Sequence, residues 1–123
     1  MKKVWVFVAL SGALAVVMGA LSAHLLKSVL TATDISRIQT AATYQIYHTL
    51  VLLVLVIYYQ ANPLKQLKSS VWLFILGIVL FSGSLYVYSF SHIHSLVYLT
   101  PIGGMLLIVA WLSLLRLLSA IRA

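Results

Sequence analysis

Four long apolar runs place the strongest limit on what this chain can fold into. The runs cover residues 4–23, 41–59, 71–90 and 97–117. An α-helix of roughly 20 residues crosses a hydrocarbon core of about 30 Å, and each run comes close to that length. Closed strand barrels alternate apolar and polar residues, and these runs do not. We therefore expect an all-α, polytopic membrane protein in which residues 1–123 form one integral membrane domain, a four-transmembrane-helix bundle.

Composition supports this class and excludes several kinds of chemistry. Of the 123 residues, 63% are hydrophobic and only 7% are charged, whereas a soluble domain of this size covers its surface with far more charge. The chain has no cysteine, which excludes disulfides, thiolate metal sites and thiol catalysis. Asp34 is the only acidic residue, so catalysis by paired carboxylates is excluded as well. We expect a protein without enzymatic activity.

The positions of the basic residues predict the orientation of the spans. If all four runs cross the membrane, Lys27 and Arg37 lie on one side with Asp34, and six basic residues lie on the other side: Lys2, Lys3, Lys65, Lys68, Arg116 and Arg122. Cytoplasmic segments carry the excess of Lys and Arg, so both termini are expected in the cytoplasm. Topology and attraction to anionic lipid headgroups then explain the net charge of +7. The lipid bilayer is the expected partner, and a nucleic acid is not.

The first run also has features of a secretory signal. Two lysines precede its apolar core, and small residues lie near positions 20–23. Its apolar stretch is longer than the roughly 7–15 residues of a usual signal core. We therefore expect this run to be retained as the first span.

Small residues predict where helices pack closely. In the first run they recur at every fourth position and form a ridge that lets another helix approach: Ser11, Ala15, Gly19 and Ala23. Gly83 in the third run and Gly103 with Gly104 in the fourth offer similar flat surfaces. We expect these surfaces to serve packing within the bundle rather than a dedicated dimer face.

Two positions predict helix ends near the connections. Thr33 or Asp34 is expected to cap a helix that starts at the outer interface and continues into the second run. Pro101 either starts the main body of the fourth helix, since proline is tolerated in a first turn, or kinks a helix that continues on both sides. We expect the first of these two arrangements.

Two polar side chains interrupt the second run. At helical spacing Gln45 and His48 share a face with Tyr44. His48 lies roughly 10 Å below the outer edge of the run, a depth at which an ionisable side chain faces the bundle interior. The interpretation we favour is a neutral imidazole that bonds to Gln45, a hydroxyl or a backbone carbonyl and fixes helix register. The alternative is a ligand, proton or substrate role.

All four histidines fall in the outer half of the predicted bundle. Neutral imidazole is the commonest metal ligand, and an axial pair from facing helices can hold a haem. The candidate metal ligands are therefore His24, His48, His92 and His94, and the candidate cofactor-binding residues are His24, His48, Tyr44 and Gln45. The spacing matches no recognised metal motif, and the carboxylates that would complete a site are missing. Binding of haem, a metal ion or a quinone is thus the second hypothesis for function.

Four blocks of sequence together resemble one known family. They are "GALSAHLLK" (19–27), "YQIYHTLVLL" (44–53), "GIVLFSGSLY" (77–86) and "LTPIGG" (99–104). In this order they resemble the domain-of-unknown-function 423 family of small bacterial membrane proteins, which has mitochondrial relatives. The resemblance implies a four-helix protein of the bacterial plasma (inner) membrane with no established activity.

Carried over residue by residue, the resemblance marks three elements. They fall on Gly19, Ala20 and His24, on Tyr44, Gln45 and His48, and on Thr100, Pro101, Gly103 and Gly104. The chain departs from the family pattern at Ser22, where glycine is expected, and at Thr49, where alanine is usual. His92 and His94 match nothing in the family pattern, which leaves His24 and His48 as the better pair.

The leading hypothesis for function is a non-enzymatic accessory, assembly or packing subunit. It would act against lipid, another membrane protein or further copies of itself. A small carrier or channel comes third, because the cytoplasmic half of the spans has almost no polar side chain to line a path.

Overall fold

The computed structural model describes residues 1–121, so the predicted cytoplasmic Arg122 lies outside the described residues. Four of its helices are long and apolar enough to cross a membrane. They are α1 (Lys2–Ala23), α2 (Ala32–Ala61), α3 (Lys65–Ser91) and a fourth that begins in the 3₁₀ turn η2 (His94–Tyr98) and continues through α4 (Leu99–Ser113), η3 (Leu114–Arg116) and α5 (Leu117–Ile121). A further 3₁₀ turn, η1 (Leu25–Ser28), follows α1. The prediction of an all-helical chain with four spanning helices is confirmed.

Helix α2 is the longest, and local chemistry sets both its ends. At its start the Thr31 hydroxyl accepts the backbone N–H of Asp34 at 3.2 Å, so the cap is Thr31 rather than Thr33 or Asp34. It ends at Ala61, before Asn62 and Pro63, because a residue that precedes proline is disfavoured in helical conformation. At about 1.5 Å per residue, the 30 residues of α2 exceed the thickness of a hydrocarbon core of about 30 Å. Because the apolar run of this helix covers only residues 41–59, we infer that most of the surplus length lies at the start of α2, in its first turns.

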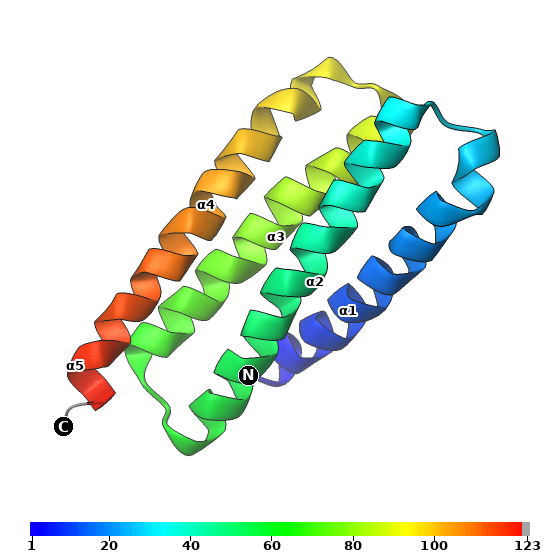
Figure 1. Cartoon of the computed structure of the whole chain (residues 1–123). Coiled ribbons are helices and arrows are strands. Elements are labelled where there is room, and N and C mark those ends of the chain that lie inside the picture. Colours follow the sequence, from blue (N-terminus) through cyan, green and yellow to red (C-terminus); the bar gives the residue numbers. More distant parts are fainter. Residues whose placement is uncertain (122–123) are drawn as a thin grey trace.

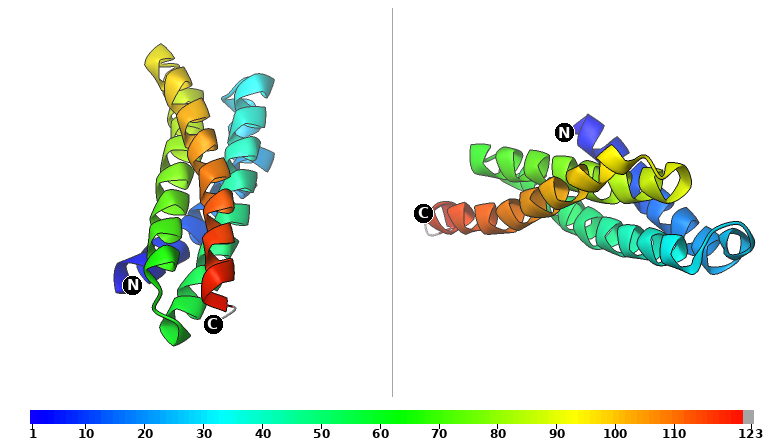
Figure 2. Two further views of the ribbon diagram at one scale, coloured as in Figure 1. Left: turned by 90° about the vertical axis from the view of Figure 1, so that its left-hand side faces the viewer. Right: turned by 90° about the horizontal axis from the view of Figure 1, so that it is seen from above.

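Each long helix packs beside its neighbour in the sequence, α1 on α2, α2 on α3 and α3 on α4 (Figure 1). Seen from the side, α1 is inclined to the other three (Figure 2). Helices α2 and α3 are the inner pair. In an apolar 18-residue segment of each helix, 44% of the residues of α2 and 50% of those of α3 are buried, against 22% for α1 and 17% for the helix that contains α4. The two edge helices therefore leave most of their apolar surface open to the surroundings.

The apolar core differs between the two ends of the molecule. At the end that holds both termini, side chains from all four long helices meet around Leu52, Val71 and Phe74, with Val8 of α1 and Leu107 of α4 packed against them. The smaller outer cluster draws only on α1, α2 and α3: Met18, Ile38, Ala41, Ala42 and Tyr86. The helices are thus gathered tightly at one end and less completely at the other.

Glycines bring α3 and α4 close together. A Cβ on Gly103 would lie 2.3 Å from the backbone nitrogen of Phe81, and one on Gly77 would lie 2.6 Å from the Leu107 side chain. Pro101 is the third residue of α4, where its missing N–H leaves no helical hydrogen bond open. It therefore starts the main helical body, as expected.

The small-residue surfaces predicted from the sequence have different environments. Ser11 and Ala15 are buried in α1, and Ser11 contacts α2. A Cβ on Gly19 or Gly83 would meet nothing within 4 Å, so the expectation of a close helix contact does not hold at these two positions. Gly104 makes an ordinary contact, with a Cβ there 3.6 Å from the Phe81 ring.

Candidate functional site

A chain of hydrogen bonds joins three helices inside the apolar part of the molecule. The Tyr86 hydroxyl of α3 donates to Gln45 Oε1 of α2 at 2.6 Å, and Gln45 Nε2 donates to Ser11 Oγ of α1 at 3.1 Å. Ser11 Oγ and Thr49 Oγ1 are 2.7 Å apart. All four side chains are buried. Because unpaired polar groups are expensive in hydrocarbon, this network explains how Gln45 is tolerated in an apolar helix.

His48 has different partners from Gln45. Its Nδ1 lies 2.6 Å from the backbone oxygen of Tyr44, one turn earlier in α2. Its ring centroid lies 6.0 Å from that of Phe74 in α3 and 6.2 Å from that of Trp111 in α4. The side chain is buried, as expected, and a backbone carbonyl was one of the partners considered. The hydrogen bond to Gln45, another of those partners, is not formed, because Gln45 points to α1 and α3 instead.

The tautomer of His48 follows from its hydrogen bond. A carbonyl oxygen only accepts, so Nδ1 carries the proton and donates to Tyr44. The lone pair on Nε2 then has no partner among the hydrogen bonds of residues 1–121. His48 also lines a shallow groove of about 700 Å³ between α2 and α4, with Tyr44, Tyr47 and Trp111.

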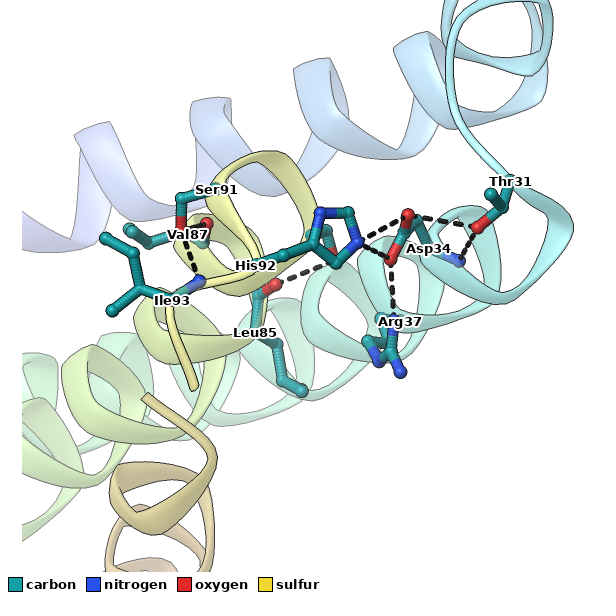
Figure 3. A network of polar contacts seen from close by, with 9 residues as sticks. Thr31, Asp34, Arg37, Leu85, Val87, Ser91, His92 and Ile93 are labelled. Carbon is teal, nitrogen blue, oxygen red and sulfur yellow. Dashed lines mark hydrogen bonds and ion pairs between the residues drawn. The ribbon is translucent and has the colours of Figure 1, made fainter. Parts of the chain in front are cut away.

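At the end opposite the two termini, a polar clasp of Thr31, Asp34, Arg37 and His92 ties the start of α2 to the end of α3 (Figure 3). Asp34 lies in the first turn of α2, and its side chain is only 2% exposed. Its carboxylate accepts from the Thr31 hydroxyl at 3.0 Å and from Arg37 at 2.6 Å. His92 Nε2 lies 3.1 and 3.0 Å from the two carboxylate oxygens. The only acid of the chain is thus placed at a helix N-terminus, where the helix dipole favours a negative charge.

Two further contacts hold the partners of Asp34 in position. The Arg37 guanidinium lies 4.8 Å from the centre of the Tyr88 ring, within the range of a cation–π interaction. His92 follows α3 with a φ of 54°, a left-handed conformation that is uncommon for a residue with a side chain. That backbone turn directs its ring toward Asp34 (Figure 3).

The clasp lowers the pKa of Asp34. Burial alone raises the pKa of this carboxyl group, but hydrogen bonds from Thr31 and His92, the charge of His92 and the hydrogen bond from Arg37 outweigh it. Asp34 lies in the part of α2 that extends beyond the hydrocarbon core, so its ion pairs belong to the membrane interface.

The structure does not gather the four histidines. His24 is exposed at the end of α1, and His94 is exposed beside Tyr98, 6.0 Å away between ring centroids. His92 is engaged with Asp34, while His48 is buried between α2 and α4. Within residues 1–121, no three His, Cys, Asp or Glu side chains come together in a way that could hold a metal ion. A cofactor held by a pair of histidines stays a prediction.

From the sequence we expect the buried polar contact of Gln45 and His48 to reach His24 or a tyrosine, which does not identify Tyr86 or Ser11 as the partners of Gln45. Tyr86 lies 41 positions away, and Ser11 lies 34 positions away on the other side, so neither is visible in the local pattern. The Asp34–Arg37 pair is visible as an i,i+3 spacing, whereas the contact of Asp34 with His92 spans 58 positions. Only the fold reveals these long-range contacts.

Comparison with known proteins shows to which family the chain belongs. The family described as "Protein of unknown function (DUF423)" matches residues 18–104. The "UPF0382 membrane protein" of Haemophilus influenzae is 44% identical over 108 residues, which are 87% of this chain and 86% of that protein. The chain belongs to the DUF423 family. The resemblance seen in the four sequence blocks is thereby confirmed.

Other DUF423 relatives are similar over most of their length. The "UPF0382 inner membrane protein YgdD" of Escherichia coli K12 is 37% identical over 123 residues, 95% of this chain and 88% of YgdD. The "UPF0382 membrane protein SSP2132" of Staphylococcus saprophyticus is 42% identical over 106 residues, 86% of this chain and 88% of that protein. No solved structure matches the chain. The chain is therefore a membrane protein of a family whose function is unknown.

The DUF423 match includes most of the polar contacts described above. Residues 18–104 contain both sides of the Asp34–His92 contact and the Gln45–Tyr86 hydrogen bond. Ser11 precedes the matched range. The α2–α3 pair with its polar contacts is thus the part of the molecule that the family match covers completely.

Proposed function

We propose that this DUF423 protein is a non-enzymatic accessory or assembly subunit of the bacterial inner membrane. The observation that carries the proposal is how the buried polar groups are used. Gln45, Ser11 and Tyr86 bond to one another across three helices, and among residues 1–121 every fully enclosed side-chain nitrogen or oxygen atom has a hydrogen-bond partner. His48 Nε2, which has none, belongs to a side chain that lines an open groove. Polar contacts of this kind act as packing devices between membrane helices.

The edge helices supply the surface for a partner. Most residues in the apolar segments of α1 and of the helix that contains α4 are not buried. Their exposed faces meet either lipid or another membrane helix. The partner is a further copy of the chain or another membrane protein. Both termini lie in the cytoplasm in this proposal, since they share one end of the molecule with the start of α3 (Figure 1), whose first turn carries Lys65 and Lys68.

The test is the mass of the complex in which the protein occurs. The full chain is extracted from its native membrane in polymer-bounded lipid discs, without detergent, and the mass of the discs' protein content is measured. A defined complex with constant stoichiometry is expected. Recovery of only single 13.6 kDa chains at every protein-to-lipid ratio would contradict the subunit role.

Unpaired Nε2 of His48 favours a second candidate, a cofactor-binding module. The nitrogen carries a lone pair and belongs to a side chain that lines the groove between α2 and α4. An absorption spectrum and elemental analysis of the same native discs decide between the two. A Soret band or stoichiometric metal that disappears in His48→Ala would make the binding role primary.

A further inference from the structure

A cavity of about 260 Å³ lies between α1 and α3, with α2 as its floor. It arises because α1 packs on α2, and α2 on α3. Leu10 and Leu14 of α1 and Val79 of α3 line it and are 66%, 45% and 50% exposed. The mouth therefore opens sideways toward the apolar surroundings, and a molecule dissolved in the bilayer reaches it directly.

The floor of this cavity is polar. Ser11, Gln45 and Tyr86 of the hydrogen-bonded network all line it. Gln45 is 4% exposed, and its amide group has two N–H donors. One N–H is donated to Ser11, and the second has no acceptor among the hydrogen bonds of residues 1–121. A buried donor beside an open cavity favours a ligand with an acceptor oxygen.

Gly83 provides part of the room. It lines the cavity, and a Cβ built on it would meet nothing within 4 Å. Its lack of a side chain therefore does not serve close helix packing, in contrast to Gly103, whose Cβ would strike the backbone of α3. Glycine is unfavourable in a helix interior by about 1 kcal/mol relative to alanine, and the space it leaves here belongs to the cavity.

The size and lining of the cavity limit the ligand. An apolar protein cavity of about 150 Å³ takes up benzene, so a cavity of about 260 Å³ accommodates a substituted ring or a short stretch of acyl chain. The walls are apolar side chains, including Phe7 and Ile78. A carbonyl or similar oxygen at the inner end would give the second N–H of Gln45 an acceptor.

We propose that the α1–α3 cavity binds a lipid-soluble molecule that places a carbonyl oxygen against the Gln45 amide and an apolar chain between α1 and α3. Two sources offer this chemistry, a quinone and an ester-linked phospholipid. The cavity shares Leu10 and Leu14 with the exposed face of α1 that the subunit role uses. The two proposals are tested by different measurements, the mass of the complex and the Gln45 amide signal, so the failure of one is distinguishable from the failure of the other.

The test follows the Gln45 amide itself. The full-length chain in detergent micelles is labelled with ¹⁵N in glutamine side chains, and the Gln45 signals are identified by their loss in Gln45→Leu. Three probes are titrated: a short-chain quinone, a diacyl phosphatidylglycerol, and the ether-linked phosphatidylglycerol that lacks carbonyl groups. A saturable shift of the Gln45 N–H signals is expected with a carbonyl probe and not with the ether lipid. A response to only one carbonyl probe identifies the source.

Two glycine variants provide the matched pair. Gly83→Leu fills the cavity and abolishes the saturable shift, while Gly19→Leu, at another glycine with open space on α1 and outside this cavity, retains it. A folded Gly83→Leu that binds like the parent overturns the proposal. If Gly83→Leu fails to fold, the parent titration still decides. The absence of saturation with both carbonyl probes, or an equal response to the ether lipid, shows bulk lipid contact only and also overturns it.

Discussion

Close approach of α3 and α4 at Gly103 makes a sharp prediction about stability. In Gly103→Ala the new Cβ would lie 2.3 Å from the Phe81 backbone nitrogen and 2.7 Å from the Leu80 carbonyl carbon. Backbone atoms cannot rotate away, so α4 has to retreat. Ordinary contact begins at 3.4 Å, which requires a shift of about 1.1 Å, the difference between these two distances.

That retreat also strains a hydrogen bond between the two helices. Ser84 Oγ and Thr100 Oγ1 are 2.6 Å apart, and Thr100 lies one turn before Gly103. Overpacking costs about 1–3 kcal/mol, and an interhelical hydrogen bond in a membrane protein contributes roughly 0.6 kcal/mol. We expect Gly103→Ala to lower the free energy of unfolding by about 2 kcal/mol relative to its control.

The control is Gly104→Ala, one residue further along α4. Its Cβ would lie 3.6 Å from the Phe81 ring, an ordinary contact. Both substitutions gain about 1 kcal/mol of helix propensity, which cancels when the two variants are compared. Unfolding of the full chain by SDS in mixed micelles, followed by circular dichroism and by tryptophan fluorescence, measures the difference. Of the three tryptophans, Trp111 reports on the α3–α4 contact because its ring packs on Phe74 of α3, with 5.6 Å between centroids. Coincident unfolding curves for the two variants would refute the close approach.

Further expectations concern the polar groups, and the same unfolding assay measures each. Tyr86→Phe removes the donor to Gln45 and lowers stability by about 1 kcal/mol, while the exposed Tyr47→Phe leaves it unchanged; equal effects would contradict the network. The pKa of Asp34 is lowered from 3.8, so its contribution to stability is fully present above that pH and is lost as the pH falls through the lowered value. In Asp34→Asn the free energy of unfolding should no longer fall at low pH for this reason. An unaltered pH profile of stability would exclude Asp34 as the source of the loss. His48→Ala should lower stability by about 1–3 kcal/mol, and a variant as stable as the parent would show that its packing is dispensable.

The membrane-spanning helices were predictable because a hydrocarbon core requires long apolar helices. The residue at which α2 starts could be predicted only in part. Thr31 and Asp34 stand at the spacing of a capping box, yet the expectation named Thr33 or Asp34 as the cap. The sequence offers several neighbouring capping residues and does not show which hydroxyl reaches a free N–H group. Thr31 does so at 3.2 Å.

Side-chain partners inside the helices were harder to predict. Successive residues of an α-helix are about 100° apart, so positions three apart differ by about 60° in direction. Gln45 and His48 share a broad face, but that difference lets Gln45 reach α1 and α3 while His48 lies against Phe74 and Trp111. Helical spacing therefore predicts which face of the helix a side chain lies on. Which residue it contacts depends on how the neighbouring helices pack.

The polar contacts are arranged according to the cost of charge at each depth. Inside the apolar part the connecting groups are hydroxyls and an amide, whereas the ion pairs of Asp34 lie at the outer end of α2. A charge in hydrocarbon is far more expensive than a neutral dipole, so an aspartate in place of Gln45 would not serve the same role. Among residues 1–121, every side-chain hydrogen bond from α1 to another helix involves Ser11. Helix α1 is therefore held at one polar point and by apolar packing, which leaves the cavity beside it.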